Sequence, residues 1–69
     1  MEIFLVRTAQ SFLCRCTDRK TSRQLAERLV RFTLENHDEM AADYGTTDEF
    51  DLVERVTKDF IAEGWPEAD

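Results

Sequence analysis

Residues 2–17, EIFLVRTAQSFLCRCT, decide the fold class of this 69-residue chain. Two runs in this stretch, EIFLVRT and SFLCRCT, are rich in Ile, Val, Phe and Thr, which favour strands. A short link separates the runs, so the pattern predicts a β-hairpin over about residues 2–17. Because two predicted helices follow the hairpin, we expect a small α+β fold in the order ββαα.

A three-residue loop of Ala9, Gln10 and Ser11 would give the hairpin two distinct faces. One face would carry Phe4, Val6, Phe12, Cys14 and Cys16. The other face would carry Ile3, Leu5, Leu13, Arg7 and Arg15, and a two-residue loop would mix the two sets. A two-stranded ribbon with apolar groups on both faces is only marginally stable alone. We therefore predict that the face with Ile3, Leu5, Leu13, Arg7 and Arg15 is a secondary interface.

The next segment predicts a helix over about residues 22–44. Thr21, followed three residues later by Gln24, fits a capping box at its start. The residues of its helical stripe are Leu25, Ala26, Leu29, Val30, Phe32 and Thr33. The stripe extends as far as Tyr44, after which Gly45 suits a helix end. We favour one continuous helix, and a break near Asn36 is the open alternative.

A second helix is predicted over about residues 47–63, with Thr46 and Glu49 forming another capping box. Its buried face is expected to hold Phe50, Val53, Val56, Phe60 and Ile61. Two ion pairs at i,i+4 spacing, Asp51 with Arg55 and Glu54 with Lys58, support the helix. Gly64, Trp65 and Pro66 then predict its end. With no linker or repeat, residues 1–69 are expected to form a single compact domain.

Charge is distributed unevenly along the chain, whose net charge is −6. Residues 1–34 hold seven basic and three acidic side chains, whereas residues 35–69 hold two basic and twelve acidic ones. The stretch ENHDEMAADYGTTDEFD, residues 35–51, has seven acidic residues and no Lys or Arg. Such asymmetry points to a charged partner, or to pairing between the two halves within one molecule or between copies.

Part of this acidic stretch has a local explanation, because acids at Asp48, Glu49 and Asp51 favour the start of a helix. On a continuous first helix, four other acids would crowd the negative end of the helix dipole instead. These are Glu35, Asp38, Glu39 and Asp43, and we predict them as a partner-binding acidic surface. A break near residue 36 would remove the conflict by making Asp38 an N-cap.

No cofactor, metal site or catalytic residue is predicted. Cys14 and Cys16 are expected to be free thiols buried in the core, since free cysteine usually behaves as a small hydrophobic residue. His37 is expected to be partly buried and hydrogen-bonded rather than a metal ligand. An EF-hand fails on spacing, because placing Gly45 sixth puts Met40 first. We expect the protein not to be an enzyme.

The predicted function is to bind another protein. The most concrete version is an acidic inhibitor or adaptor that engages a basic surface of a protein or complex that handles nucleic acid. In size and acidity the chain is similar to small phage-encoded anti-CRISPR and DNA-mimic proteins.

Two alternatives to this function stay open. One is a nucleic-acid-binding regulator that uses the basic hairpin and helix start, although direct nucleic-acid binding is not expected because the acidic half would repel phosphate. The other is a self-assembling subunit, with a homodimer as its simplest form. No membrane contact is expected, because the apolar run Ile3 to Val6 is too short for a signal-peptide core or a membrane span, and the predicted location is cytoplasmic.

Overall fold

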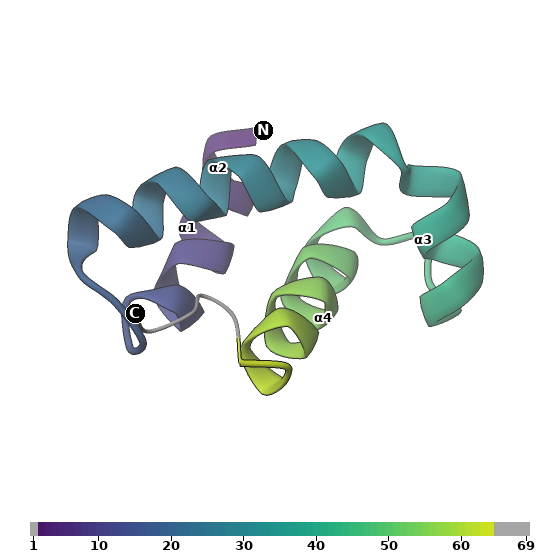
Figure 1. The fold of residues 1–69 in the computed structure, drawn as a ribbon. Helices are drawn as coiled ribbons and strands as arrows, with labels where there is room; N and C mark the ends of the chain where they lie inside the picture. The colour runs from purple at the N-terminus through teal and green to yellow at the C-terminus, as the bar shows by residue number, and fades with distance from the viewer. Residues whose placement is uncertain (1, 65–69) are drawn as a thin grey trace.

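The computed structural model describes residues 2–64, and within this range the chain forms four helices and no strand (Figure 1). They are α1 (Glu2–Leu13), α2 (Arg19–Glu35), α3 (His37–Tyr44) and α4 (Glu49–Ala62). The predicted α+β fold is therefore wrong, since all of the first run and the first three residues of the second form one helix. Trp65 and Pro66, which were predicted to follow the last helix, lie outside the described residues.

Three apolar residues spaced four apart explain why α1 is a helix. Leu5, Ala9 and Leu13 are four residues apart and are 2%, 0% and 0% exposed. In the predicted hairpin Ala9 belonged to the loop, and Leu5 and Leu13 shared a face with two arginines. A helix buries all three on one side, and this tertiary packing outweighs the strand preference of the individual residues.

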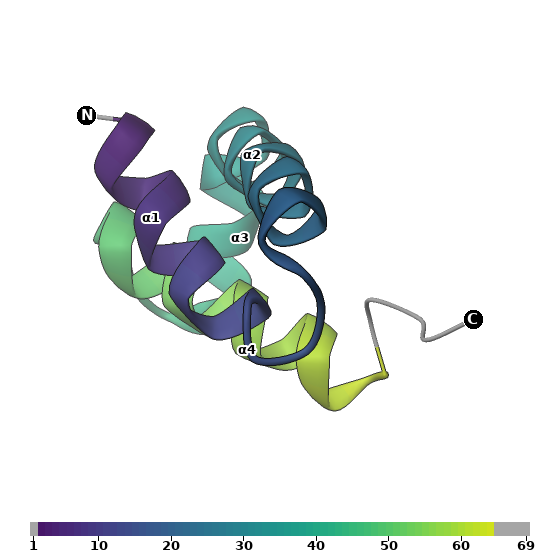
Figure 2. The ribbon, with the colours of Figure 1, turned by 90° about the vertical axis from the view of Figure 1, so that its left-hand side faces the viewer.

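α1 packs against both α2 and α4, as the side view shows (Figure 2). These three helices enclose one core, which Leu5, Ala9, Leu13, Ala26, Leu29, Val30, Val53 and Val56 fill. α3 lies beyond the end of α2, where Met40 and Tyr44 pack against the core although no residue of α3 is fully buried. The result is a flat molecule, about 32 × 25 × 15 Å along its principal axes.

Two aromatic residues that were predicted to face the core are exposed. Phe32 is 45% exposed and Phe50 is 48% exposed, whereas Phe60 and Ile61 are partly buried against the core. The buried stripes of α2 and α4 are narrower than predicted. Alanine, valine and leucine, rather than phenylalanine, fill most of the core that these helices share with α1. Phe32 lies at the edge of the α2 stripe, on the side of α2 that faces Phe60.

The long first helix that we favoured from the sequence is interrupted at Asn36. This residue ends α2 and precedes α3, so α2 and α3 are separate helices. Its side-chain amide donates a hydrogen bond of 2.9 Å to the carbonyl of Phe32, which also accepts from the Asn36 backbone N–H at 3.1 Å. Asn favours such local bonds over a regular helix interior. α3 then ends as predicted at Gly45, whose φ of +73° suits glycine.

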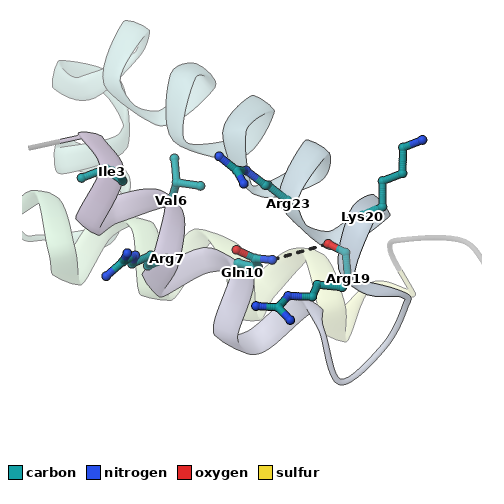
Figure 3. Close-up of a pocket in the computed structure, with 7 residues that line it drawn as sticks. All are labelled: Ile3, Val6, Arg7, Gln10, Arg19, Lys20 and Arg23. Carbon is teal, nitrogen blue, oxygen red and sulfur yellow. Dashed lines mark hydrogen bonds between the residues drawn. The ribbon is translucent and has the colours of Figure 1, made fainter.

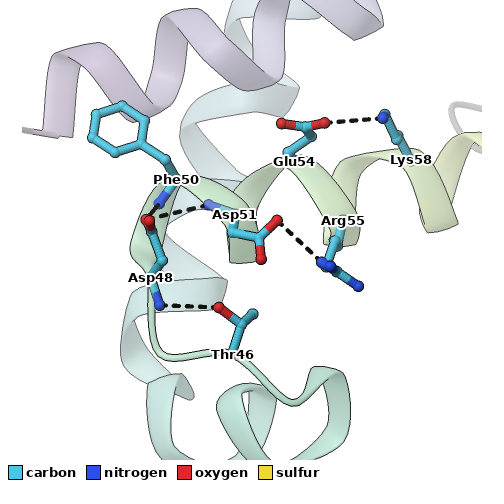
Figure 4. Close-up of polar contacts among 7 residues, drawn as sticks. All are labelled: Thr46, Asp48, Phe50, Asp51, Glu54, Arg55 and Lys58. Carbon is cyan, nitrogen blue, oxygen red and sulfur yellow. Dashed lines mark hydrogen bonds and ion pairs between the residues drawn. The ribbon is translucent and has the colours of Figure 1, made fainter.

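Aspartates, rather than the predicted threonines, cap α2 and α4. Asp18 Oδ1 accepts a 2.7 Å bond from the backbone N–H of Thr21, so α2 begins three residues before the predicted start. Asp48 Oδ1 accepts bonds from the N–H groups of Phe50 at 2.9 Å and Asp51 at 3.4 Å (Figure 4). Thr46 instead supports Asp48, because its hydroxyl accepts the Asp48 N–H at 3.3 Å.

Both predicted ion pairs of α4 are confirmed. Arg55 Nε lies 3.1 Å from Asp51 Oδ1, and Lys58 Nζ lies 2.9 Å from Glu54 Oε2 (Figure 4). Each pair is largely exposed, so it stabilises α4 by only a few tenths of a kcal/mol, roughly 0.3–0.5. Lys58 also lies over the ring of Phe12, 5.3 Å from its centroid, which links α4 to α1.

None of the helices of residues 2–64 combines the length and the apolar composition that crossing a bilayer requires. α2 is the longest, and its sequence carries several charged residues.

The packing of α1 predicts that an acidic substitution lowers the stability strongly at Ala9 and hardly at all at Ser11. The predicted hairpin would have placed both residues in the same loop. Ala9→Asp puts a carboxylate into a fully packed site, so we expect a loss of at least about 3 kcal/mol of unfolding free energy. Ser11→Asp lies on the exposed side of α1 and should change it by less than about 0.5 kcal/mol. Urea denaturation followed by circular dichroism measures both. Equal tolerance at the two positions would contradict the helical packing of α1.

Candidate binding surfaces

The four acids predicted to bind a partner are all exposed, around the junction of α2 and α3. Glu35 is the last residue of α2, Asp38 and Glu39 are in the first turn of α3, and Asp43 is one turn further along. Glu35, Asp38 and Glu39 also line one shallow pocket of about 280 Å³, and Asp43 lies outside it. We call Glu35, Asp38, Glu39 and Asp43 the acidic ridge.

The break at Asn36 changes the electrostatics of the acidic ridge. Asp38 and Glu39 now stand at the positive end of the α3 dipole, where carboxylates are favoured. Glu35 and Asp43 still lie at the negative ends of α2 and α3, and neither helix has a basic residue in its last turn. The helix dipole therefore explains the positions of Asp38 and Glu39. Glu35 and Asp43 instead oppose the dipoles of their own helices.

Ion pairs in the part of the chain that the structure describes leave most of the acidic ridge uncompensated. The nearest basic group is the imidazole of His37, whose Nδ1 lies 3.8 Å from Asp38 Oδ1. Glu35, Glu39 and Asp43 form no salt bridge within residues 2–64. Their charges are consequently directed to the solvent, where a partner can reach them.

Two contacts fix the position of α3, and with it the ridge. His37 Nε2 donates to the carbonyl of Thr47 at 3.2 Å, so the prediction of a partly buried, hydrogen-bonded histidine is confirmed. The hydroxyl of Tyr44 donates to Asp59 Oδ2 at 2.6 Å and joins α3 to α4. This hydrogen bond, together with burial and nearby acids, raises the pKa of Tyr44 to about 12.

A basic groove runs between α1 and α2 on a different part of the molecule (Figure 3). Its volume is about 570 Å³, and its lining consists of Ile3, Val6, Arg7, Gln10, Arg19, Lys20 and Arg23. Gln10 spans the groove, since its Nε2 lies 3.4 Å from the carbonyl oxygen of Arg19. Four of the seven lining side chains are cationic. We call these seven residues the basic groove.

The predicted secondary interface is divided between the core and the surface. Leu5 and Leu13 are buried and cannot contact a partner. Ile3 and Arg7 line the basic groove, and Arg15 is exposed in the turn after α1. The prediction grouped them at the two-residue period of a strand, whereas Ile3, Val6, Arg7 and Gln10 share a helical face. Testing a helical period over residues 2–13 would have grouped the groove residues of α1.

The cysteines are exposed, so the prediction that they are buried in the core is wrong. Cys14 and Cys16 lie in the turn after α1, and both are free thiols. Helix formation by residues 2–13 moves this turn to the surface. Within residues 2–64, no group of three or more His, Cys, Asp or Glu side chains is arranged to hold a metal ion.

Comparisons of the chain with protein-family models, curated proteins and solved structures gave no match. No residue role can therefore be carried over from a relative. The acidic ridge and the basic groove are the two features from which function can be argued.

The Tyr44–Asp59 hydrogen bond predicts a pH-dependent contribution to stability. Because the folded pKa of Tyr44 is raised to about 12, the contribution is complete below the unfolded value near 10 and is lost as the pH rises towards 12. Tyr44→Phe removes only the hydroxyl and should cost about 1 kcal/mol at pH 8. Urea denaturation of both proteins between pH 8 and 11 should show this difference shrinking. A difference that stays constant over that range would contradict the assignment.

Proposed function

We propose that the protein is a non-enzymatic binding module whose acidic ridge contacts a basic surface of another protein. One observation carries the proposal: Glu35 and Asp43 oppose the dipoles of their own helices, are exposed and form no salt bridge within residues 2–64. Charges in such positions slightly destabilise the folded domain. A role in binding explains why the chain carries them.

The acids of α4 provide the comparison. Asp48 caps the helix, and Asp51 and Glu54 pair with Arg55 and Lys58. These carboxylates have partners inside the fold, so their field is partly cancelled at the surface. The ridge carboxylates are not compensated in this way and act at distances up to the screening length, about 8 Å at physiological salt.

The chemistry of the ridge indicates the class of partner. Exposed carboxylates at the end of α2 and along α3 present negative charge at close spacing, as a phosphate backbone does, and therefore fit surfaces rich in Lys and Arg. Proteins that handle nucleic acid carry such surfaces. We propose an inhibitor or adaptor that covers a phosphate-binding surface of such a protein, in the cytoplasm.

Neutralising the ridge tests this function. The ridge variant carries Glu35→Gln, Asp38→Asn, Glu39→Gln and Asp43→Asn. A matched control neutralises four carboxylates of and after α4, Glu49, Asp51, Glu54 and Glu63, with the same change in net charge. The partner is first captured from the native host with the unaltered protein, identified by mass spectrometry and purified. Binding of all three proteins is then measured by calorimetry at low and high salt.

The ridge variant should bind the partner roughly tenfold or more weakly at low salt, and its binding should depend less on salt. The control should stay close to the unaltered protein. Thermal melting should show that the ridge variant remains folded, because it loses two unfavourable and two favourable charges, whose effects on stability are small and of opposite sign. Unchanged affinity of the ridge variant at low salt would contradict the proposal. Stronger binding of that variant to DNA or RNA oligonucleotides, with no protein partner captured, would favour a nucleic-acid-binding regulator.

A further inference from the structure

We propose that the basic groove receives the acidic ridge of a second copy of this chain, so that the protein associates with itself head to tail. The proposal concerns the groove, to which the proposed function assigns no role, and it stands whether or not the ridge also binds a different protein.

The basic groove is part of a longer depression along α1 and α2. A second hollow of about 360 Å³ shares Ile3, Val6 and Arg23 with it and continues past Val30 to Arg31. At the other end, a third hollow shares Arg7, Gln10 and Arg19 and reaches the turn before α2. The concave surface therefore follows most of the length of α1, which is long enough to take the eight residues of α3.

Charge in the groove is strongly positive and largely unpaired. Arg7, Arg19 and Lys20 form no salt bridge within residues 2–64, and Arg23 makes only an exposed one with Glu27 at 3.8 Å. Arg19 and Lys20 also lie at the positive end of the α2 dipole, which disfavours them in the isolated molecule. An occupant that brings carboxylates would relieve this repulsion.

The acidic ridge complements this lining in shape as well as in charge. Positions 38, 39, 42 and 43 share one face of α3, and on that face the small residue Ala42 stands between the acids. The groove likewise combines cations with apolar surface, since Ile3 is 58% exposed and Val6 is half-buried beside it. Ala42 allows close approach to Ile3 and Val6 while the carboxylates meet the arginines.

The same features disfavour a nucleic acid as the occupant. A phosphate backbone would meet the cations but would leave Ile3 without an apolar contact. It would also approach a chain whose net charge is −6. A second copy brings the acids on a short helix and adds no long polyanion.

The positions of the two surfaces on α2 limit the form of the association. The groove lies at the start of α2 and the ridge begins at its end, so the 17 residues of α2 separate them by roughly 25 Å (Figure 1). One molecule cannot place its own ridge in its own groove. The contact therefore joins different copies. The rotation between copies decides whether they form a reciprocal pair, a closed ring or an open chain.

Complementation between two defective variants tests the proposal. The ridge variant described above keeps its groove, and a groove variant with Arg7, Arg19, Lys20 and Arg23 each changed to Gln keeps its ridge. Analytical ultracentrifugation at about 20 mM and about 500 mM salt measures the mass of each protein, alone and mixed. Circular dichroism confirms that the altered positions, all exposed, leave the helices intact.

The unaltered protein should increase in average mass with concentration at low salt and become monomeric at high salt. Each variant should be monomeric alone, and an equimolar mixture should form dimers and nothing larger, because only one productive contact remains. A control that changes Arg15, Arg28, Arg55 and Lys58 to Gln alters the charge equally outside the groove. This control should associate as the unaltered protein does.

Three results would overturn the inference: an unaltered protein that stays monomeric at low salt up to millimolar concentration, a mixture that forms no dimer, or a groove variant that still associates. Binding of the unaltered protein to DNA or RNA oligonucleotides that the groove variant loses, without self-association, would assign the groove to nucleic acid instead. The groove variant should still bind the captured partner through its ridge. Failure of self-association with partner binding intact therefore contradicts only this inference.

Discussion

The burial of one side of α1 is the constraint on which the rest of the structure depends. Leu5, Ala9 and Leu13 exclude solvent only when α2 and α4 cover the same helix from two directions. The absence of a side chain beyond Cβ at Ala9 permits this close packing. Without that contact, α2 and α4 would lose the element on which both depend, since a domain of this size has one small core.

The arrangement of charge follows from the same packing. α1 and the start of α2 bring most of the basic half of the sequence to one part of the molecule, and α3 and α4 carry the acids. α2 belongs to both regions, because its first residues line the groove and its last residue belongs to the ridge. A separation that is visible along the sequence thus becomes a separation in space. As a result, this small domain carries a basic surface and an acidic surface at different places.

Sequence patterns predicted the second half of the molecule better than the first. Sequence rules for helical periodicity, for ion pairs at i,i+4 spacing and for glycine at helix ends predicted α4, its two ion pairs and the end of α3 at Gly45. These rules hold where tertiary packing does not override the local preference of the residues. The first helix was missed because Ile, Val and Phe in residues 2–13 favour strands, while the decisive residue, Ala9, resembled part of a loop. Local sequence does not reveal that α2 and α4 cover that alanine.

The candidate site was predicted only in part. The acidic ridge was identified from charge alone, and the structure places three of its four acids around one shallow pocket. The basic groove was missed because its residues come from two helices, one of which was expected to be a hairpin. Exposure of Phe32 and of both cysteines was also missed, since it depends on the width of the buried stripe and on the surface turn after Leu13.

The backbone conformation of residues 2–13 tests the central claim most directly, because both the core and the basic groove require α1 to be a helix. Nuclear magnetic resonance of the full chain measures it through Cα chemical shifts, sequential amide contacts and amide exchange. The structure predicts helical shifts throughout Glu2–Leu13, together with slow exchange at Ala9 and Leu13. Extended shifts with cross-strand contacts between residues 2–8 and 11–17 would contradict it.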